Sequence, residues 1–129
     1  MKFNVLVTGG VYSSQSGYSA LQFCKAAYAA GHTISQVFFY RDAVSQTSRL
    51  TVPLGDEFNA VDQWQAFYQA TNTPLVVCVS AAERRGVLNA DQANEFAKDS
   101  DNLAPCFDVQ GLGVLHDASL DSDRTVTFK

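Results

Sequence analysis

Three cysteines are the residues of this chain that are best suited to covalent chemistry: Cys24, Cys78 and Cys106. Their number is odd, and no two of them form a CxxC pair. The two histidines, His32 and His116, therefore have no cysteine pair beside them with which to bind a metal. Disulfide frameworks use even numbers of cysteines, and zinc sites use closely spaced ligand pairs. We therefore expect no metal site and no cofactor, and we expect any cysteine chemistry to be that of a single thiol.

Cys78 has the sequence surroundings of a reactive thiol. It lies near the end of Leu75–Val79, an apolar and β-branched run that predicts a buried strand. Ser80 and Glu83 follow with the S-x-x-E spacing of a capping box, which predicts that a helix begins directly after this strand. Amide groups at the start of a helix favour a thiolate, and a thiolate is the nucleophilic form of cysteine.

Arg84 and Arg85 follow within the next two turns and would add positive potential near Cys78. A persulfide sulfur is one electrophile that such a thiolate attacks. The alternative is an inert core thiol, because Cys78 alternates with Val77 and Val79 as an ordinary core residue does. Position alone leaves both interpretations open.

The other two cysteines have different surroundings. Cys24 lies on the apolar face of a predicted helix together with Leu21 and Tyr28, so we expect it to be a small core residue. Cys106 follows Pro105 in a predicted loop, where we expect partial exposure. A role for Cys106 as a second reactive thiol remains an open alternative.

Gly9 and Gly10 follow the first predicted strand, as glycines do in phosphate-binding loops. The segment lacks the complete G-x-G-x-x-G spacing and a G-K-[ST] ending. We therefore expect the glycines to permit a tight turn and not to bind phosphate. The loop around Tyr12 should lie at the same sheet edge as Cys78, where it would shape access to the thiol.

The elements that position these residues alternate between strands and helices. This alternation predicts a single three-layer α/β/α domain over residues 1–129, with a mostly parallel sheet of about five strands. The aromatic residues in the second long helix are expected to be chiefly core, with a subunit contact as the alternative. The predicted strands are Phe3–Thr8, Ile34–Tyr40, Leu75–Val79, Phe107–Gln110 and Arg124–Phe128, and the predicted helices are Ser16–Ala30, Glu57–Ala70, Ser80 to Gly86, Ala90–Lys98 and Leu112–Leu120.

The composition excludes several classes of protein. The chain has 129 residues, of which 47% are hydrophobic and 17% charged, as in a globular domain. It has no apolar run long enough to span a membrane and no signal-peptide pattern, so we expect a cytoplasmic protein. The net charge is -4, and Arg84-Arg85 is the largest basic cluster. We therefore expect no direct binding of nucleic acid.

The order of motifs along the chain resembles that of the DsrE/TusD sulfurtransferase family, and the resemblance covers essentially the whole chain. Its most specific part is the cysteine block that ends in an R-R-G turn. The matching segments are Phe3–Gly9, Val37–Val44, Asp56–Phe58 with Trp64, Cys78–Val87, Gly111–Gly113, Ala118–Leu120 and Asp123-Arg124.

The resemblance implies a DsrE-like fold and a heterohexamer with TusB-like and TusC-like subunits. It also implies that Cys78 accepts a persulfide sulfur from a TusA-like carrier and passes it to a TusE-like acceptor. The sulfur would end in the 2-thiouridine of the tRNA wobble position. Sulfur handling of the DsrE type in sulfur oxidation, a non-catalytic structural subunit, and a flavodoxin-like nucleotide-binding domain are the alternatives. Some relatives have a cysteine where this chain has Ser122, so a scheme with two thiols is weakened here.

Overall fold

Five parallel strands form one sheet in the order β4-β3-β2-β1-β5. The structure is a computed structural model that describes residues 1–129. All five strands were predicted from the sequence, and each predicted boundary lies within one residue of the observed one. The strands are β1 (Lys2–Val7), β2 (Thr33–Phe39), β3 (Leu75–Cys78), β4 (Phe107–Gln110) and β5 (Arg124–Phe128).

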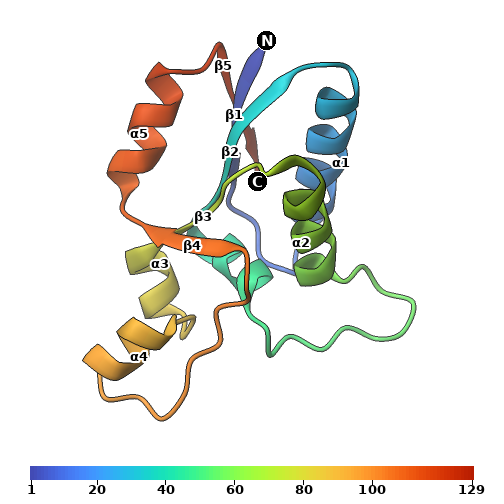
Figure 1. The fold of residues 1–129 in the computed structure, drawn as a ribbon. Coiled ribbons are helices and arrows are strands. Elements are labelled where there is room, and N and C mark those ends of the chain that lie inside the picture. Colours follow the sequence, from blue (N-terminus) through green and yellow to red (C-terminus); the bar gives the residue numbers. More distant parts are fainter.

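Helices cover both faces of this sheet (Figure 1). Helices α1 and α2 lie on one face, and α3, α4 and α5 lie on the other. The predicted three-layer α/β/α architecture is therefore confirmed. The helices are α1 (Ser16–Ala29), the 3-10 helix η1 (Arg41–Thr47), α2 (Ala60–Thr71), α3 (Val79–Arg84), α4 (Ala90–Glu95) and α5 (Leu112–Leu120).

The predicted helices differ from the observed ones in several places. Helix η1 lies between β2 and α2, where no helix was predicted. Helix α2 begins three residues later than expected because the Asn59 side chain caps it, accepting a hydrogen bond from the backbone N–H of Asp62 at 3.2 Å. Helix α4 ends at Glu95 instead of Lys98, since Ala97 adopts a left-handed φ of 53° that cannot continue the helix.

The core on the α1/α2 face is organised around Trp64. Its indole ring meets the Phe39 ring edge-on at 5.2 Å, and its Nε1–H donates a 3.1 Å hydrogen bond to Gln46 Oε1. Gln46 in turn donates from Nε2 to the carbonyl of Gly9 at 3.0 Å, so the buried amide joins the end of β1 to α2. Tyr28 was predicted to share the buried face of α1, but it is 47% exposed.

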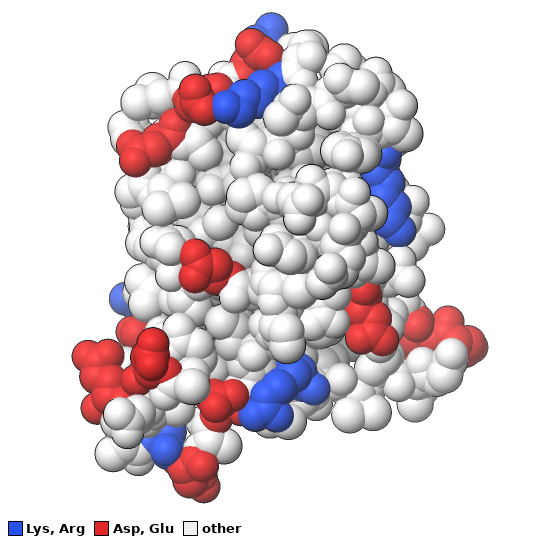
Figure 2. Space-filling view, viewed as in Figure 1, with Lys and Arg blue, Asp and Glu red and all other residues white.

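The opposite face is more thinly covered. Helix α5 contributes no buried residue, and only Val114 and Leu115 pack partly against the core. None of the helices is long and apolar enough to cross a membrane. On the face shown in Figure 2, acidic side chains gather around α4 and basic side chains form no continuous patch.

Candidate functional site

Cys78 lies at the carboxyl end of β3, next to Gln110 of β4 in the strand register. Its neighbour Val77 pairs with Phe39, whose ring packs on α2. Because successive side chains of a strand point to opposite faces, Cys78 points toward the layer of α3 and α5. The side chain is 1% exposed, so the thiol is buried in the isolated chain.

The helix after Cys78 begins earlier than predicted, and it is not closed by a capping box. Cys78 itself is the N-cap, and no side chain caps this helix end. The predicted partnership of Ser80 and Glu83 is wrong, because Glu83 Oε1 instead accepts a hydrogen bond from Gln92 Nε2 at 3.1 Å. The capping box of this region lies at α4, where the side chains of Asn89 and Gln92 pair reciprocally with the backbone.

The sulfur of Cys78 has one polar contact. Its Sγ lies 3.6 Å from Ser80 Oγ, which is within the range of a weak hydrogen bond to sulfur. Helix α3 spans six residues, so few peptide dipoles add up at the end nearest the thiol. The Ser80 hydroxyl is therefore the specific polar group that the structure brings to this cysteine.

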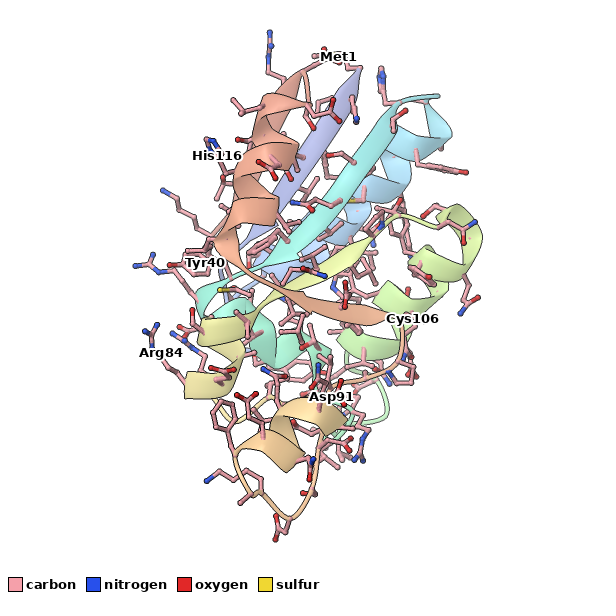
Figure 3. The ribbon with its side chains drawn as sticks, turned by 60° about the vertical axis from the view of Figure 1, so that its left-hand side comes forward. Met1, Tyr40, Arg84, Asp91, Cys106 and His116 are labelled. Carbon is pink, nitrogen blue, oxygen red and sulfur yellow. The ribbon has the colours of Figure 1, made fainter.

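Arg84 and Arg85 do not contact the thiol. Arg85 donates from Nε to Asp42 Oδ1 at 2.9 Å and from Nη1 to the Ala81 carbonyl at 3.2 Å. Arg84 is exposed and points away from the ribbon (Figure 3). Arg85 instead forms a solvent-exposed ion pair with Asp42 of η1, and neither arginine hydrogen-bonds to Cys78.

Cys24 is fully buried on the core face of α1, as predicted. Burial in this apolar setting raises the pKa of its thiol from 9.0 to about 12. The thiol therefore stays protonated at neutral pH and cannot act as a nucleophile there.

The pKa of Cys24 predicts an alkaline loss of stability. The unfolded chain loses the Cys24 proton near pH 9, whereas the folded chain keeps it to about pH 12, so unfolding becomes easier as the pH rises between these values. Between pH 8 and pH 10 we expect this thiol to lower the free energy of unfolding by about 1.4 kcal/mol. Urea titrations of the wild type and Cys24→Ala at both pH values measure the effect. If the difference in stability between the two proteins does not change with pH, the prediction is wrong.

Cys106, labelled in Figure 3, immediately precedes the amino end of β4, whereas Cys78 lies at the carboxyl end of the neighbouring parallel strand β3. Cys106 is partly exposed, as predicted, and Gln69 Nε2 donates to its Sγ at 3.5 Å. The structure therefore does not bring Cys106 and Cys78 together as a thiol pair. No group of three or more His, Cys, Asp or Glu side chains lies close enough to hold a metal ion.

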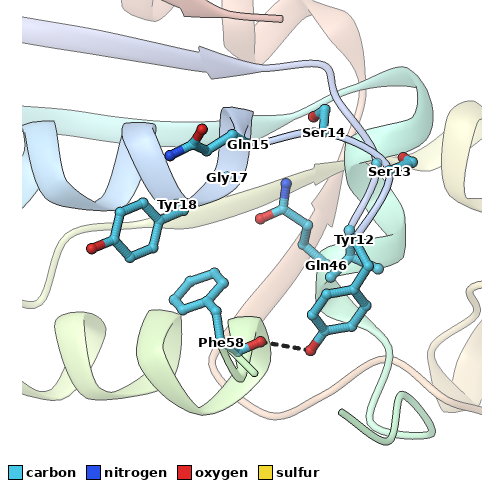
Figure 4. A pocket seen from close by; sticks show the side chains of 10 residues that line it. Tyr12, Ser13, Ser14, Gln15, Gly17, Tyr18, Gln46 and Phe58 are labelled. Carbon is cyan, nitrogen blue, oxygen red and sulfur yellow. Dashed lines mark hydrogen bonds between the residues drawn. The ribbon is translucent and has the colours of Figure 1, made fainter. Parts of the chain in front are cut away.

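The loop around Tyr12 encloses a separate cavity of about 480 Å³ on the α1/α2 side (Figure 4). The Tyr12 hydroxyl donates to the carbonyl of Phe58 at 2.7 Å and so closes one wall of this cavity. Cys78 is not among the residues that line this cavity. A Cβ on Gly9 would lie 2.1 Å from Ser14 Oγ, which supports the interpretation of a tight turn.

Comparisons with known proteins agree with this architecture. Residues 1–128 match the model of the DsrE/DsrF-like family. The sulfurtransferase TusD of Cronobacter sakazakii (strain ATCC BAA-894) is 43% identical over 128 residues, which cover 99% of this chain and 100% of that protein. The crystal structure of the ychN protein from E. coli superposes with a TM-score of 0.76 at 22% identity, covering 99% of this chain and 100% of that one. The predicted DsrE-like fold is thereby confirmed.

Proposed function

This chain belongs to the DsrE/DsrF-like family, and from that premise we propose that it is a sulfurtransferase that carries a persulfide sulfur on Cys78. The similarity to the sulfurtransferase TusD, over nearly the full length of both chains, supports this activity. The observation that carries the choice of residue is positional. Cys78 is the one thiol of the three at the carboxyl edge of the parallel sheet, where α/β proteins of this kind form their sites.

The proposed reaction exchanges one sulfur–sulfur bond for another. The Cys78 thiolate attacks the outer sulfur of a donor persulfide, R–S–SH, and forms Cys78–S–SH. The donor's S–S bond breaks and the donor leaves as the thiolate R–S⁻. A second thiolate, on the acceptor, then takes the outer sulfur in the same way and releases the Cys78 thiolate. No electrons are gained or lost overall, so neither an oxidant nor a cofactor is needed.

The scheme needs only one thiol of this chain. Cys106 lies at the other sheet edge. Ser122, where some relatives have a cysteine, lies with its Oγ 2.9 Å from Ser35 Oγ, near the beginning of β2 and also remote from Cys78. The acceptor thiol must therefore come from another protein.

The wider setting follows from the family. We place the chain in the cytoplasm, in a heterohexamer with TusB-like and TusC-like subunits. A TusA-like carrier supplies the sulfur, a TusE-like protein accepts it, and the product is 2-thiolated tRNA wobble uridine. Sulfur handling in sulfur oxidation is the alternative pathway for the same chemistry.

Burial of Cys78 favours one rival function. A thiol that is 1% exposed cannot contact a protein-bound persulfide unless the structure around the carboxyl end of β3 opens locally. If it never opens, this chain is a structural subunit of its complex, and a sister subunit holds the working thiol.

Mass spectrometry separates the two functions. The assembled complex is incubated with a persulfide-loaded carrier, and this chain is then weighed intact and mapped by peptide. The proposal expects a mass gain of one sulfur atom, located on the peptide that contains Cys78. An unchanged mass of this chain, with sulfur on a sister subunit, would establish the structural role instead.

A further inference from the structure

We propose that the Ser80 hydroxyl is the hydrogen-bond donor that holds the Cys78 thiolate during sulfur transfer. This inference rests on the proposed function, and it names a second residue that touches the reacting sulfur. Ser80 Oγ lies 3.6 Å from Cys78 Sγ, and each of the two groups has no other hydrogen-bond partner in the structure. A thiolate can only accept, so in the reactive state the hydroxyl must be the donor.

Ser80 has no competing structural duty. The sequence pattern predicted that its side chain would cap α3, but Cys78 occupies the N-cap position and no side chain caps the helix. A serine inside a helix often donates to the carbonyl three or four residues earlier. For Ser80 those carbonyls belong to Val77 and Val76, which lie in β3 and not in a preceding helical turn. The Ser80 hydroxyl is therefore free to donate a hydrogen bond to Cys78 Sγ.

The same hydrogen bond acts in both steps of the relay. In the first step it stabilises the attacking thiolate of Cys78. In the second step the Cys78 sulfur is the leaving group, and it regains its negative charge as the acceptor removes the outer sulfur. A donor fixed beside this atom lowers the free energy of the charged sulfur each time it forms.

Ionisable side chains also lie on the elements around Cys78, but none of them hydrogen-bonds to it. Ser80 Oγ pairs only with Cys78 Sγ, so a comparison of Ser80 variants tests the hydroxyl. The ionisable side chains are Tyr40, Arg41 and Asp42 at the end of β2 and in η1, Glu83, Arg84 and Arg85 in and after α3, and Asp108 on β4.

The experiment compares Ser80→Ala, Ser80→Thr and a control, Ser119→Ala, in the assembled complex. Ser119 is a helical serine that bonds to the His116 carbonyl in α5, away from the carboxyl edge of β3. Alkylation of Cys78 by iodoacetamide, followed by peptide mapping, is measured across pH, together with the rate of sulfur uptake from a persulfide-loaded carrier. Thermal melts establish that each variant is folded.

In Ser80→Ala we expect the midpoint pH of Cys78 alkylation to rise by about one unit. At pH values below the midpoint, the fraction of Cys78 present as thiolate then falls about tenfold. Sulfur uptake at pH 7 should slow by a similar factor, and Ser80→Thr, which keeps the hydroxyl, should restore both. Ser119→Ala should match the wild type.

Three results would overturn the assignment of Ser80: an unchanged midpoint in Ser80→Ala, no rescue by threonine, or an equal shift in Ser119→Ala. The alkylation profile is independent of sulfur transfer. If the wild type takes up no sulfur while its midpoint still depends on Ser80, the proposed function fails but the contact stands. If sulfur uptake is normal in every variant and the midpoint does not move, the contact fails but the proposed function stands.

Discussion

Cys78→Ser is expected to reduce sulfur loading of this chain to background, because a serine hydroxyl is not ionised at neutral pH and cannot form a persulfide. Cys24→Ser and Cys106→Ser are the matched controls. Cys24 is buried with a thiol pKa of about 12, and Cys106 lies at the other sheet edge, so neither should be needed for loading. The measurement is intact mass after incubation with a persulfide-loaded carrier, with all partner subunits present.

Unfolding would imitate a loss of loading, so the stability of Cys78→Ser must be measured as well. The change places a hydroxyl in a site that is 1% exposed, next to the Ser80 hydroxyl that can partner it. We expect a cost of at most about 1–2 kcal/mol in the free energy of unfolding. A folded Cys78→Ser variant that still gains sulfur, with the sulfur mapped to Cys106, would show that the working thiol was assigned to the wrong residue.

Trp64→Ala is expected to have the largest effect on stability. Trp64 is fully buried, and its ring packs against both Phe39 and Phe67. Removing it should cost about 3–5 kcal/mol, which is a large share of the roughly 5–15 kcal/mol that stabilises a typical domain. The change also leaves Gln46 Oε1 without its donor. Urea denaturation followed by circular dichroism measures the loss.

Two further variants test the reason for that loss. Trp64→Phe keeps an aromatic ring and removes the N–H, so we expect about 1–3 kcal/mol from the unpaired Gln46 oxygen and the smaller ring. Phe96→Ala removes an aromatic side chain that is 46% exposed, and we expect less than about 1 kcal/mol. Equal losses in Trp64→Ala and Phe96→Ala would refute the central place of Trp64 in the core.

The three central strands could be predicted from sequence because each is a short apolar run, and β5 could be predicted from its alternating pattern. The beginning of α3 could not. Ser80 and Glu83 match a capping box, but Glu83 is drawn to Gln92, and this partner is brought close only by the packing of α4. The 3-10 helix η1 was missed for a similar reason, since its buried face is defined by contacts with α2, α3 and β3.

The site was predicted in part. The position of Cys78 at the carboxyl end of β3 was predicted, because Cys78 lies at the end of an apolar run in a parallel sheet. Its burial agrees with the apolar run that contains it, whereas its contact with Ser80 was not predicted. The sequence suggested that Arg85 adds positive potential near the thiol. In the structure Arg85 instead pairs with Asp42, which lies 43 residues earlier in the chain and was not a predictable partner.

The burial of Cys78 also sets how this chain withstands peroxide. Conversion of a cysteine to sulfenic and then to irreversible sulfinic acid follows thiolate character and access to the oxidant. Cys78 is 1% exposed, whereas Cys106 is partly open to solvent. Small oxidants in bulk water therefore reach Cys106 first. Cys78, the thiol that we propose for sulfur transfer, is shielded until the carboxyl end of β3 opens. The burial that limits its access to a persulfide donor therefore also protects it from irreversible oxidation.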